Sequence, residues 1–594
     1  MKSNTTAIWF VLAVALAACI WIFQHHFQPA APVVAGLLPG LRPDRVTDVQ
    51  VIPNGSREIS VVRTNSAWLL QKPVAYPAQA AAIETLLAVL EKLTPVTRLT
   101  AEELRGRKNA DAEFGFENKQ FSLVVEAGDQ RWQLLVGKPT APGDQVFVRV
   151  VGMDDVFVTD TAWLQYLPHS GNDWRDTALV DAAGACDSII ITNGAKVIEL
   201  RCDPTNHLWR MTRPLPARAD GERIAAALQQ LRSARVQFVS DDPKADLTAF
   251  GLQPAELDVW LGSGTNFLAA VHAGKNPPEN PALIYARREG WNSVLTVAKD
   301  AVAPWRGAVN DFRDAHLLTL TAPVAEIEVR GENNNNFTLR RSGTNAWTLA
   351  GEKFSADPEN VQVLLRLLAG FRASEFVKDR NTMVDLQGFG LGTPSRQITL
   401  RTVAGDTNSV LVQLQFGTAG TNQVFVKRAD EDYVYALPLD DFKSMPVNGW
   451  TFRDRRIWNF STNDVTQLTI RQNGKTRQIV RDAAGKWSLA PGSQGVLDAR
   501  WMETIVSQFG DMTAAGWIAR NFTEPEKFGF TPQGLQITIE LKDGRKFTVD
   551  FGPEMQAQAG LAAVTLDGER WAFVCPTSLY QFALLYLNIP PNTP

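Results

Sequence analysis

The stretch RTNSAWLLQKP at residues 63–73 carries a tryptophan in a β-like run, and similar stretches return three more times in the 594-residue chain. The counterparts are PTNHLWRMTRP at 204–214, SGTNAWTLAGE at 342–352 and AAGKWSLAPG at 483–492. Their tryptophans, Trp68, Trp209, Trp347 and Trp487, lie 141, 138 and 140 residues apart. A fixed period of this kind is the signature of tandem structural repeats.

Two further markers share the period. Phe-Gly followed by Phe or Leu has its glycine at Gly115, Gly251, Gly390 and Gly529, at spacings of 136, 139 and 139. An Arg-Asp pair after an aromatic residue ends three of the segments, at Arg175-Asp176, Arg313-Asp314 and Arg453-Asp454. We therefore expect four modules, over residues 44–182, 183–322, 323–463 and 464–594.

Each segment between a marker tryptophan and its Phe-Gly pair predicts one amphipathic helix, because apolar residues recur at i, i+3, i+4 and i+7. Asp220, Asp357 and Asp498 stand where N-caps are expected, and Pro358 takes the first helical position of the third copy. The apolar faces are Ile83, Leu86, Leu87, Leu90; Ile224, Ala227, Leu228, Leu231; Val361, Leu364, Leu365, Leu368; and Met502, Ile505, Val506, Phe509.

The rest of each module predicts strands. Asn54-Gly55 and Asn193-Gly194 separate pairs of β-like runs, which is a strong hairpin signal. Alternating runs such as 121–126, 132–136, 145–150 and 156–159 follow the Phe-Gly pair. We predict an α+β fold: each module is a curved, mainly antiparallel sheet with one main helix on a face and a short helix near its end, such as 161–167. The strand order is left open.

The N-terminal region predicts a membrane anchor at 1–27. Its uncharged run AIWFVLAVALAACIWIF, residues 7–23, has about the length that one span needs. Lys2 weakly favours a cytoplasmic N-terminus, which would place the bulk of the chain in the periplasm. Two alternatives stay open: lipidation at Cys19 after Leu16-Ala17-Ala18, or cleavage near Ala13 to Ala15. Residues 28–43 carry four prolines and predict a semi-rigid linker.

Composition narrows the function classes. The chain has 59 Lys and Arg against 63 Asp and Glu, a net charge of −4, and a pI near 6.0. Proteins that bind nucleic acid usually show a basic surplus, so no nucleic-acid partner is expected. A hydrophobic content of 45% is that of a folded globular protein.

The repeated tryptophan hairpin, the Phe-Gly turn, hydrophobic-Gly steps such as Val136-Gly137 and Phe416-Gly417, and the single apolar N-terminal run resemble the bacterial family of domain of unknown function 4340. The second copy departs from the pattern with His272-Ala273-Gly274. The resemblance implies an envelope-facing accessory of an ABC-type transport machine, because members are often encoded beside ABC permeases and gliding-type auxiliary proteins.

No residues qualify as a catalytic, cofactor-binding or metal site. The six histidines, His25, His26, His169, His207, His272 and His316, lack the spacing of a zinc-protease helix and predict surface or hydrogen-bonded roles. Gly262 to Asn266 lacks the lysine of a phosphate loop and predicts a hairpin turn. The recurring Arg-Asp pairs favour structural ion pairs or caps. Asn193-Gly194 as the two-residue turn would place Cys186 opposite Arg201, and a bulge would be needed to pair Cys186 with Cys202.

We expect a non-enzymatic, membrane-anchored extracytoplasmic protein that binds protein partners as a scaffold of an ABC-type export or gliding-like complex, such as permease or auxiliary subunits. The alternative is a module that binds cell-wall glycan or another extracellular polymer, with Trp163, Trp291 or Trp571 stacking on sugars, although a core position is expected for these tryptophans. An uncharacterised envelope enzyme is a third possibility. No cofactor is expected.

Overall fold

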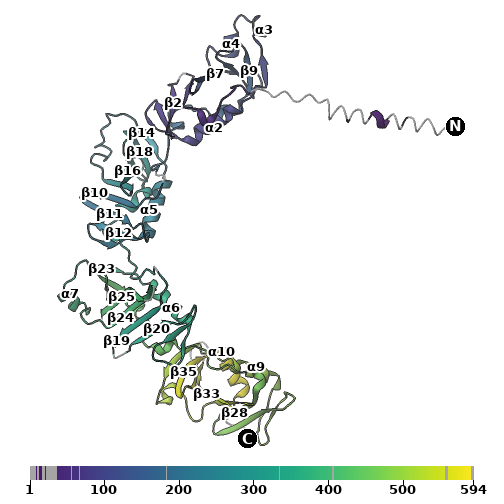
Figure 1. The fold of residues 1–594 in the computed structure, drawn as a ribbon, viewed down its shortest axis with the longest axis vertical. Coiled ribbons are helices and arrows are strands. Elements are labelled where there is room, and N and C mark those ends of the chain that lie inside the picture. The colour runs from purple at the N-terminus through teal and green to yellow at the C-terminus, as the bar shows by residue number, and fades with distance from the viewer. Residues whose placement is uncertain are drawn as a thin grey trace, which may run out of the picture. The chain divides into compact units, whose positions relative to one another are not determined.

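A computed structural model describes residues 9, 13–16, 21, 36–54, 56–65, 67–181, 184–320, 322–332, 335–404, 407–554 and 560–589. The chain divides into two compact units, residues 1–313 and 314–594, and each unit contains two antiparallel sheets (Figure 1). The four segments predicted from the repeat are numbered modules 1 to 4 in chain order, and each contains one of the four sheets. The prediction of tandem, mainly antiparallel modules is confirmed.

The sheet of module 1 has nine strands in the order β4-β3-β2-β1-β6-β7-β8-β9-β5. Four strands precede the main helix and four follow the Phe-Gly turn, while β5 joins the far edge beside β9. The strands are β1 (Asp48–Pro53), β2 (Ile59–Thr64), β3 (Ala67–Lys72), β4 (Tyr76–Pro77), β5 (Thr97–Leu99), β6 (Phe121–Ala127), β7 (Gln130–Pro139), β8 (Gln145–Val150) and β9 (Val156–Asp160).

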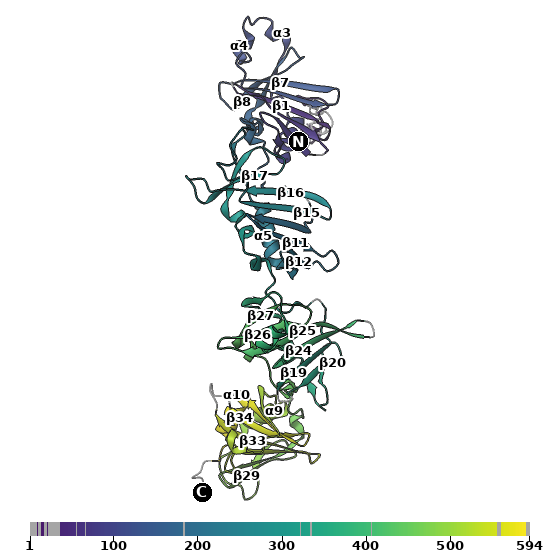
Figure 2. The ribbon, with the colours of Figure 1, turned by 90° about the vertical axis from the view of Figure 1, so that its left-hand side faces the viewer.

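Modules 2 and 3 repeat this order (Figure 2). Module 2 has β10 (Ser188–Asn193), β11 (Lys196–Cys202), β12 (Trp209–Arg213), β13 (Ala217–Arg218), β14 (Gln237–Ser240), β15 (Leu257–Ser263), β16 (Asn266–Ala273), β17 (Leu283–Arg288) and β18 (Val294–Ala298). Module 3 has β19 (Glu326–Gly331), β20 (Phe337–Arg341), β21 (Trp347–Leu349), β22 (Ser355–Ala356), β23 (Glu375–Lys378), β24 (Arg396–Ala404), β25 (Thr407–Ala419), β26 (Gln423–Arg428) and β27 (Val434–Pro438).

Module 4 keeps the topology with eight strands, because its described residues form no counterpart of β4. They are β28 (Val465–Gln472), β29 (Lys475–Arg481), β30 (Trp487–Leu489), β31 (Gly516–Arg520), β32 (Gln536–Leu541), β33 (Lys546–Glu554), β34 (Gly560–Leu566) and β35 (Glu569–Cys575). The order left open by the sequence is thus the same meander in every module, with the strand after the helix added at the far edge.

The main helices are α2 (Ala80–Glu91), α5 (Gly221–Ser233), α6 (Pro358–Ala369) and α9 (Ala499–Gly510). All sixteen predicted apolar positions of these helices are buried. In module 1 this face shares one hydrophobic core with Val49, Val51 and Leu123 of the sheet. The Asp220, Asp357 and Asp498 side chains accept hydrogen bonds from backbone N–H groups of the first turn, which confirms the predicted N-caps.

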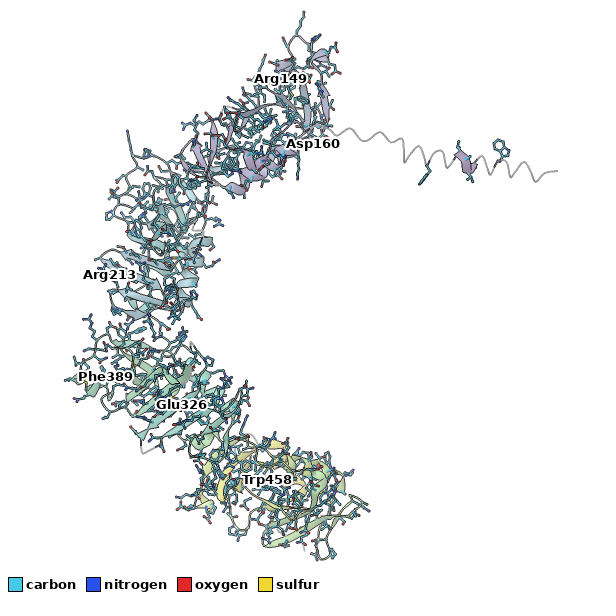
Figure 3. The ribbon with its side chains drawn as sticks, in the orientation of Figure 1. Arg149, Asp160, Arg213, Glu326, Phe389 and Trp458 are labelled. Carbon is cyan, nitrogen blue, oxygen red and sulfur yellow. The ribbon has the colours of Figure 1, made fainter. Side chains whose placement is uncertain are left out.

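The Phe-Gly turn and the hydrophobic-Gly step are fixed against each other. Gly390 takes a left-handed φ of +69°, and the Thr418 N–H donates to the Phe389 carbonyl at 2.9 Å (Phe389 is labelled in Figure 3). A Cβ on Gly417 would lie 2.2 Å from that carbonyl oxygen, so only glycine fits. The same approach measures 2.1 Å at Gly137 against Phe114 and at Gly274 against Phe250. Gly274 therefore has the same role as Gly137 and Gly417, despite the changed residues before it.

One predicted turn is shifted by a residue. Ser188, rather than Cys186, lies opposite Arg201, and Asn193 pairs with Lys196, so the two turn residues are Gly194 and Ala195. Gly194 is the first of the two central residues of this turn and has a φ of +59°, which is the pattern of a type II′ turn. The sequence instead predicts Asn193 and Gly194 as the two central residues. The Gly262 to Asn266 stretch forms the predicted hairpin turn, between β15 and β16.

Short helices complete the modules. The predicted helix at 161–167 is a 3-10 helix, η2 (Thr161–Tyr166). Its counterparts are α8 (Leu439–Lys443) in module 3 and α10 (Thr577–Phe582) in module 4. Module 1 also has α3 (Ala101–Leu104) and α4 (Ala110–Phe114), and module 3 has α7 (Met383–Gly388).

The anchor prediction falls mostly outside the described residues, since only 9, 13–16 and 21 of the apolar run are described. No helix in the described part of the chain combines the length and the hydrophobicity that a membrane span requires. At the end of the predicted linker, Leu37, Leu38 and Leu41 are buried in the core of module 1. Residues 36–41 therefore help to build that module.

Candidate functional site

Two of the three recurring arginines, Arg175 and Arg453, lie where one module meets the next within a unit. In unit 1, the Arg175 guanidinium donates to both carboxylate oxygens of Asp241 in module 2, at 2.6 and 3.0 Å, and to the Ser293 hydroxyl at 3.0 Å. Its Cζ also lies 4.7 Å from the Tyr76 ring centroid and 3.8 Å from that of Phe238. Arg175 is 1% exposed, so it joins modules 1 and 2 from a buried position.

Asp241 makes this joint sensitive to acid. Burial opposes its charge, but hydrogen bonds from Arg175 and Ser293 outweigh burial and hold the Asp241 pKa below its usual 3.8. A lowered folded pKa stabilises the protein above the unfolded value, and this contribution is lost as the pH falls through the folded value. The free energy of unfolding, measured as the pH is lowered, should therefore fall more steeply below about pH 4 in the wild type than in Asp241→Asn. Equal slopes would show that the pair does not stabilise the joint.

Unit 2 repeats the joint with different partners. Arg453 donates to Asp567 at 2.8 Å, and its Cζ lies 4.7 Å from the ring centroids of both Phe354 and Trp571. Phe354, just before β22, occupies the position in module 3 that Tyr76, the first residue of β4, occupies in module 1. An aromatic residue therefore lies at this position in both joints. A second arginine, Arg520, donates to Glu352 of module 3 and to Glu569 of module 4, and these hydrogen bonds raise the Arg520 pKa.

The aspartates of the Arg-Asp pairs have a separate task. Asp176, Asp314 and Asp454 each accept a hydrogen bond at 2.9 Å from the backbone N–H two residues later. This hydrogen bond forms a tight turn, after which the chain makes an isolated β-bridge with the segment that follows the next main helix. The bridged pairs are Ala178 with Arg235, His316 with Arg372, and Arg456 with Thr513. The predicted structural role of these pairs is thus divided between a cap and, for Arg175 and Arg453, an ion pair with the following module.

His272 is the most enclosed histidine of the described chain. Its Nδ1 lies 2.5 Å from Asp258 Oδ1 and its Nε2 lies 2.6 Å from Glu289 Oε2. Both ring nitrogens face carboxylates, so neither is free to act on a substrate or to bind a metal. Among the described residues, no group of three His, Cys, Asp or Glu side chains could hold a metal ion.

The other histidines and the cysteines that the structure describes lie in ordinary structural surroundings. His316 Nδ1 bonds to Asp314, His169 lies against the Phe121 ring, and His207 occupies a loop with a φ of +58°. His25 and His26 lie outside the described residues. Cys186, Cys202 and Cys575 are free thiols, and burial raises the Cys575 pKa to about 12, which makes it a poor nucleophile. Cys19 lies outside the described residues.

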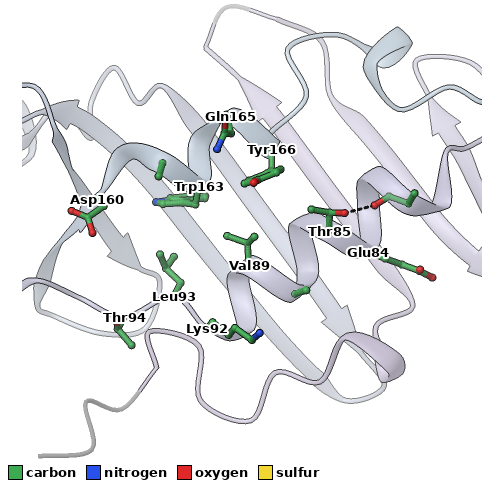
Figure 4. Close-up of a pocket in the computed structure, with 13 residues that line it drawn as sticks. Glu84, Thr85, Val89, Lys92, Leu93, Thr94, Asp160, Trp163, Gln165 and Tyr166 are labelled. Atoms are coloured by element: carbon green, nitrogen blue, oxygen red, sulfur yellow. Dashed lines mark hydrogen bonds between the residues drawn. The ribbon is translucent and has the colours of Figure 1, made fainter. Parts of the chain in front are cut away.

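An open groove of about 800 Å³ lies on module 1, between α2 and η2 (Figure 4). Trp163 forms part of its wall, and the Thr85 hydroxyl donates to the Ala81 carbonyl at 2.6 Å. Its titratable lining residues are Glu84, Lys92, Asp160 and Tyr166. No hydrogen bond or ion pair joins any two of these four described side chains.

The three tryptophans considered for sugar stacking are packed. Trp163 and Trp571 are buried, and Trp291 lies against Tyr76 with ring centroids 5.3 Å apart. The core positions expected for Trp163 and Trp571 are therefore confirmed. The structure instead exposes Trp260 and Phe267, whose ring centroids are 5.7 Å apart on the face of the module 2 sheet that bears His272. Alternation in β15 could have indicated this face, since Leu257, Val259 and Leu261 point into the core.

A family model with the description "Domain of unknown function (DUF4340)" matches residues 68–190, 209–387 and 347–533. These segments together cover about three quarters of the chain. The chain belongs to the DUF4340 family. The three DUF4340 segments begin at Trp68, Trp209 and Trp347, which are the marker tryptophans of modules 1 to 3. No curated protein and no solved structure matches the chain.

Proposed function

We propose that this DUF4340 protein is a non-enzymatic, membrane-anchored extracytoplasmic scaffold, an accessory of an ABC-type export or gliding-like envelope complex. The observation that carries the proposal is the use of the recurring polar residues. Arg175 and Arg453 are buried in the joints between modules, and the three motif aspartates cap the turns that follow. Stacked repeats build extended binding surfaces, and two of the three recurring arginines fix neighbouring modules to each other in this chain.

The joints also suit a scaffold mechanically. Each combines a charged hydrogen bond with aromatic rings on the guanidinium, and unit 2 adds the Arg520 bridge between Glu352 and Glu569. Charge-assisted bonds of this kind fix orientation as well as distance. Two modules held in one orientation would present a partner with a larger fixed surface than one module could.

Crosslinking in the native membrane tests the proposal. The tagged full chain is crosslinked, extracted in mild detergent and analysed by mass spectrometry beside a variant lacking residues 1–34, which keeps the core residues Leu37, Leu38 and Leu41. We expect ABC permease or gliding-type auxiliary subunits to copurify with the full chain and to be lost with the shortened one. Recovery of the full chain alone, or a shortened chain that stays in the membrane fraction, would contradict the proposal.

A second candidate is binding of a cell-wall glycan, and the exposed pair Trp260 and Phe267 favours it. An aromatic pair beside the carboxylates Asp258 and Glu289 offers a stacking surface with hydrogen-bond acceptors for sugar hydroxyls. If this candidate is correct, the full chain is retained on cell-wall polymer and Trp260→Ala releases it. Trp501→Ala, at a similarly exposed tryptophan of module 4, is the matched control.

A further inference from the structure

One position of the repeat changes its chemistry in a single module. The sixth residue after the glycine of each Phe-Gly pair is Phe121 in module 1, Leu257 in module 2, Arg396 in module 3 and Leu535 in module 4. The three apolar residues are buried in their cores. Arg396 therefore places a cation where the rest of the chain places hydrophobic packing.

Packing and pairing do not account for this arginine. Arg396 Nη1 is buried and has no hydrogen-bond partner, and Cζ lies 5.0 Å from the Phe442 ring of α8. Burial lowers the pKa of the guanidinium, and the charge of nearby Glu332 opposes that shift. A buried N–H donor without a partner is costly, which points to a ligand that completes it.

The corresponding corner of the sheet is closed in two other modules. In module 2, Arg306 reaches back and donates to the Gly274 carbonyl at 3.0 Å, and in module 4 the Tyr580 hydroxyl donates to the Gly552 carbonyl at 2.9 Å. In module 3 the Gly417 carbonyl accepts from the hydroxyl of Ser395, the residue before β24, at 3.2 Å. The corner is then left as a pocket of about 550 Å³.

The lining of this pocket is mainly polar. Besides Arg396, it includes the side chains of Glu332, Asn335, Thr393, Ser395 and Thr418. Arg396 and Glu332 carry opposite charges, yet no ion pair joins these two described side chains. A guanidinium can pair bidentately with a carboxylate or with a phosphate. Glu332 would repel a phosphate dianion and attract an ammonium group, which favours a ligand that carries both a carboxylate and an ammonium group.

We propose that the pocket of module 3 binds a small zwitterion of the amino-acid class, with its carboxylate on Arg396 and its ammonium group facing Glu332. The hydroxyls of Thr393 and Thr418 and the amide of Asn335 are available as further hydrogen-bond partners. The volume leaves room for a side chain beyond the two charged groups. This proposal is independent of the proposed scaffold function.

Calorimetric titration of the full chain in mild detergent tests the charge pattern. The probes are L-alanine, L-alaninamide without the carboxylate, N-acetyl-L-alanine without the ammonium group, and inorganic phosphate. We expect L-alanine to bind at least about tenfold more tightly than each of the other three, because only it satisfies both charges. No binding of L-alanine up to a final probe concentration of about 10 mM, or tighter binding of phosphate, would overturn the proposal.

Two variants then assign the roles. Arg396→Leu installs the residue found in modules 2 and 4, so we expect it to fold, with a Tm equal to the wild type or up to about 4 °C higher, and to weaken alanine binding about a hundredfold. Glu332→Gln should weaken L-alanine binding about tenfold and leave N-acetyl-L-alanine unaffected. Arg330→Leu, at an exposed arginine on the neighbouring strand, is the matched control with unchanged binding.

Arg396→Lys guards against a folding defect, since it keeps the cation but loses the planar fork, and it should bind more weakly than the wild type and more tightly than the leucine variant. Wild-type affinity in Arg396→Leu would overturn the assignment. So would an Arg396→Leu variant that unfolds while Arg396→Lys binds at full affinity, because the arginine would then serve the fold and any cation would serve the ligand.

Discussion

Gly417→Ala is expected to lower the free energy of unfolding of unit 2 by about 3 kcal/mol, because a methyl group would lie 2.2 Å from the Phe389 carbonyl oxygen and 3.0 Å from Leu391. The neighbour is backbone, which cannot turn aside as a side chain can. Relief would require the Phe-Gly turn to move away from β25 and to break the Thr418 to Phe389 hydrogen bond. Calorimetric unfolding of the full chain measures the loss.

Gly388→Ala is the matched control in the same module. Gly388 is the last residue of α7, and a Cβ there would meet nothing within 4 Å. The control should change stability by less than about 0.5 kcal/mol. Gly552→Ala in module 4 should cost less than Gly417→Ala, since its Cβ would lie 3.3 Å from the nearest carbonyl oxygen. Equal losses at Gly388 and Gly417 would show that the turn and the strand do not constrain each other.

Arg453→Ala is expected to cost about 2–3 kcal/mol and to loosen modules 3 and 4 from each other, because it removes a guanidinium packed against Phe354 and Trp571. Hydrogen exchange of the backbone around Phe354 and Trp517 should become faster. Trp517 donates its indole N–H to the Arg453 carbonyl, which the alanine variant retains. The increase therefore reports on the lost side chain.

We expect the ion pair between Arg453 and Asp567 to contribute less than the rings to the stability of this joint. Asp567 is 55% exposed, so water screens its charge, and its φ of +52° suits asparagine better than alanine. Asp567→Asn removes the charge but keeps an oxygen that can accept from Arg453, so it should cost less than about 1 kcal/mol. The asymmetry between the two variants is the decisive result. If Asp567→Asn costs as much as Arg453→Ala, the joint is held by charge, and the rings of Phe354 and Trp571 do not stabilise it.

Much of the fold follows from period and alternation. The four main helices, their buried faces and three caps were predictable because a helix that covers a sheet must repeat apolar residues at 3.6-residue intervals. The strand order could not be predicted in this way, because hairpin signals identify only strands that are neighbours in sequence. β5 instead pairs with β9, at the far edge of the sheet. The turn at Gly194 was missed since Asn-Gly and Gly-Ala both satisfy a two-residue loop, and backbone φ decides between them.

The candidate sites were harder to predict for a related reason. Arg175 is recognisable as a recurring arginine, but Asp241, its partner, lies 66 residues later and has no motif of its own. Arg396 could have been found, because counting six residues from each motif glycine exposes the one charged member. Its significance depends on knowing that the other three members are core residues, which only the packed sheets show.

The edges of these sheets bear on a hazard of tandem repeats, which is exchange of strands between neighbouring copies of similar sequence. One edge of each sheet is closed by a strand of two or three residues: β4, β13, β22 and β30. The opposite edge strands of modules 2, 3 and 4, β14, β23 and β31, are interrupted by a register shift. Short or bulged edges offer few consecutive backbone groups to a foreign strand. A nascent chain can therefore hold several similar sheets in succession with little tendency to domain swapping or aggregation.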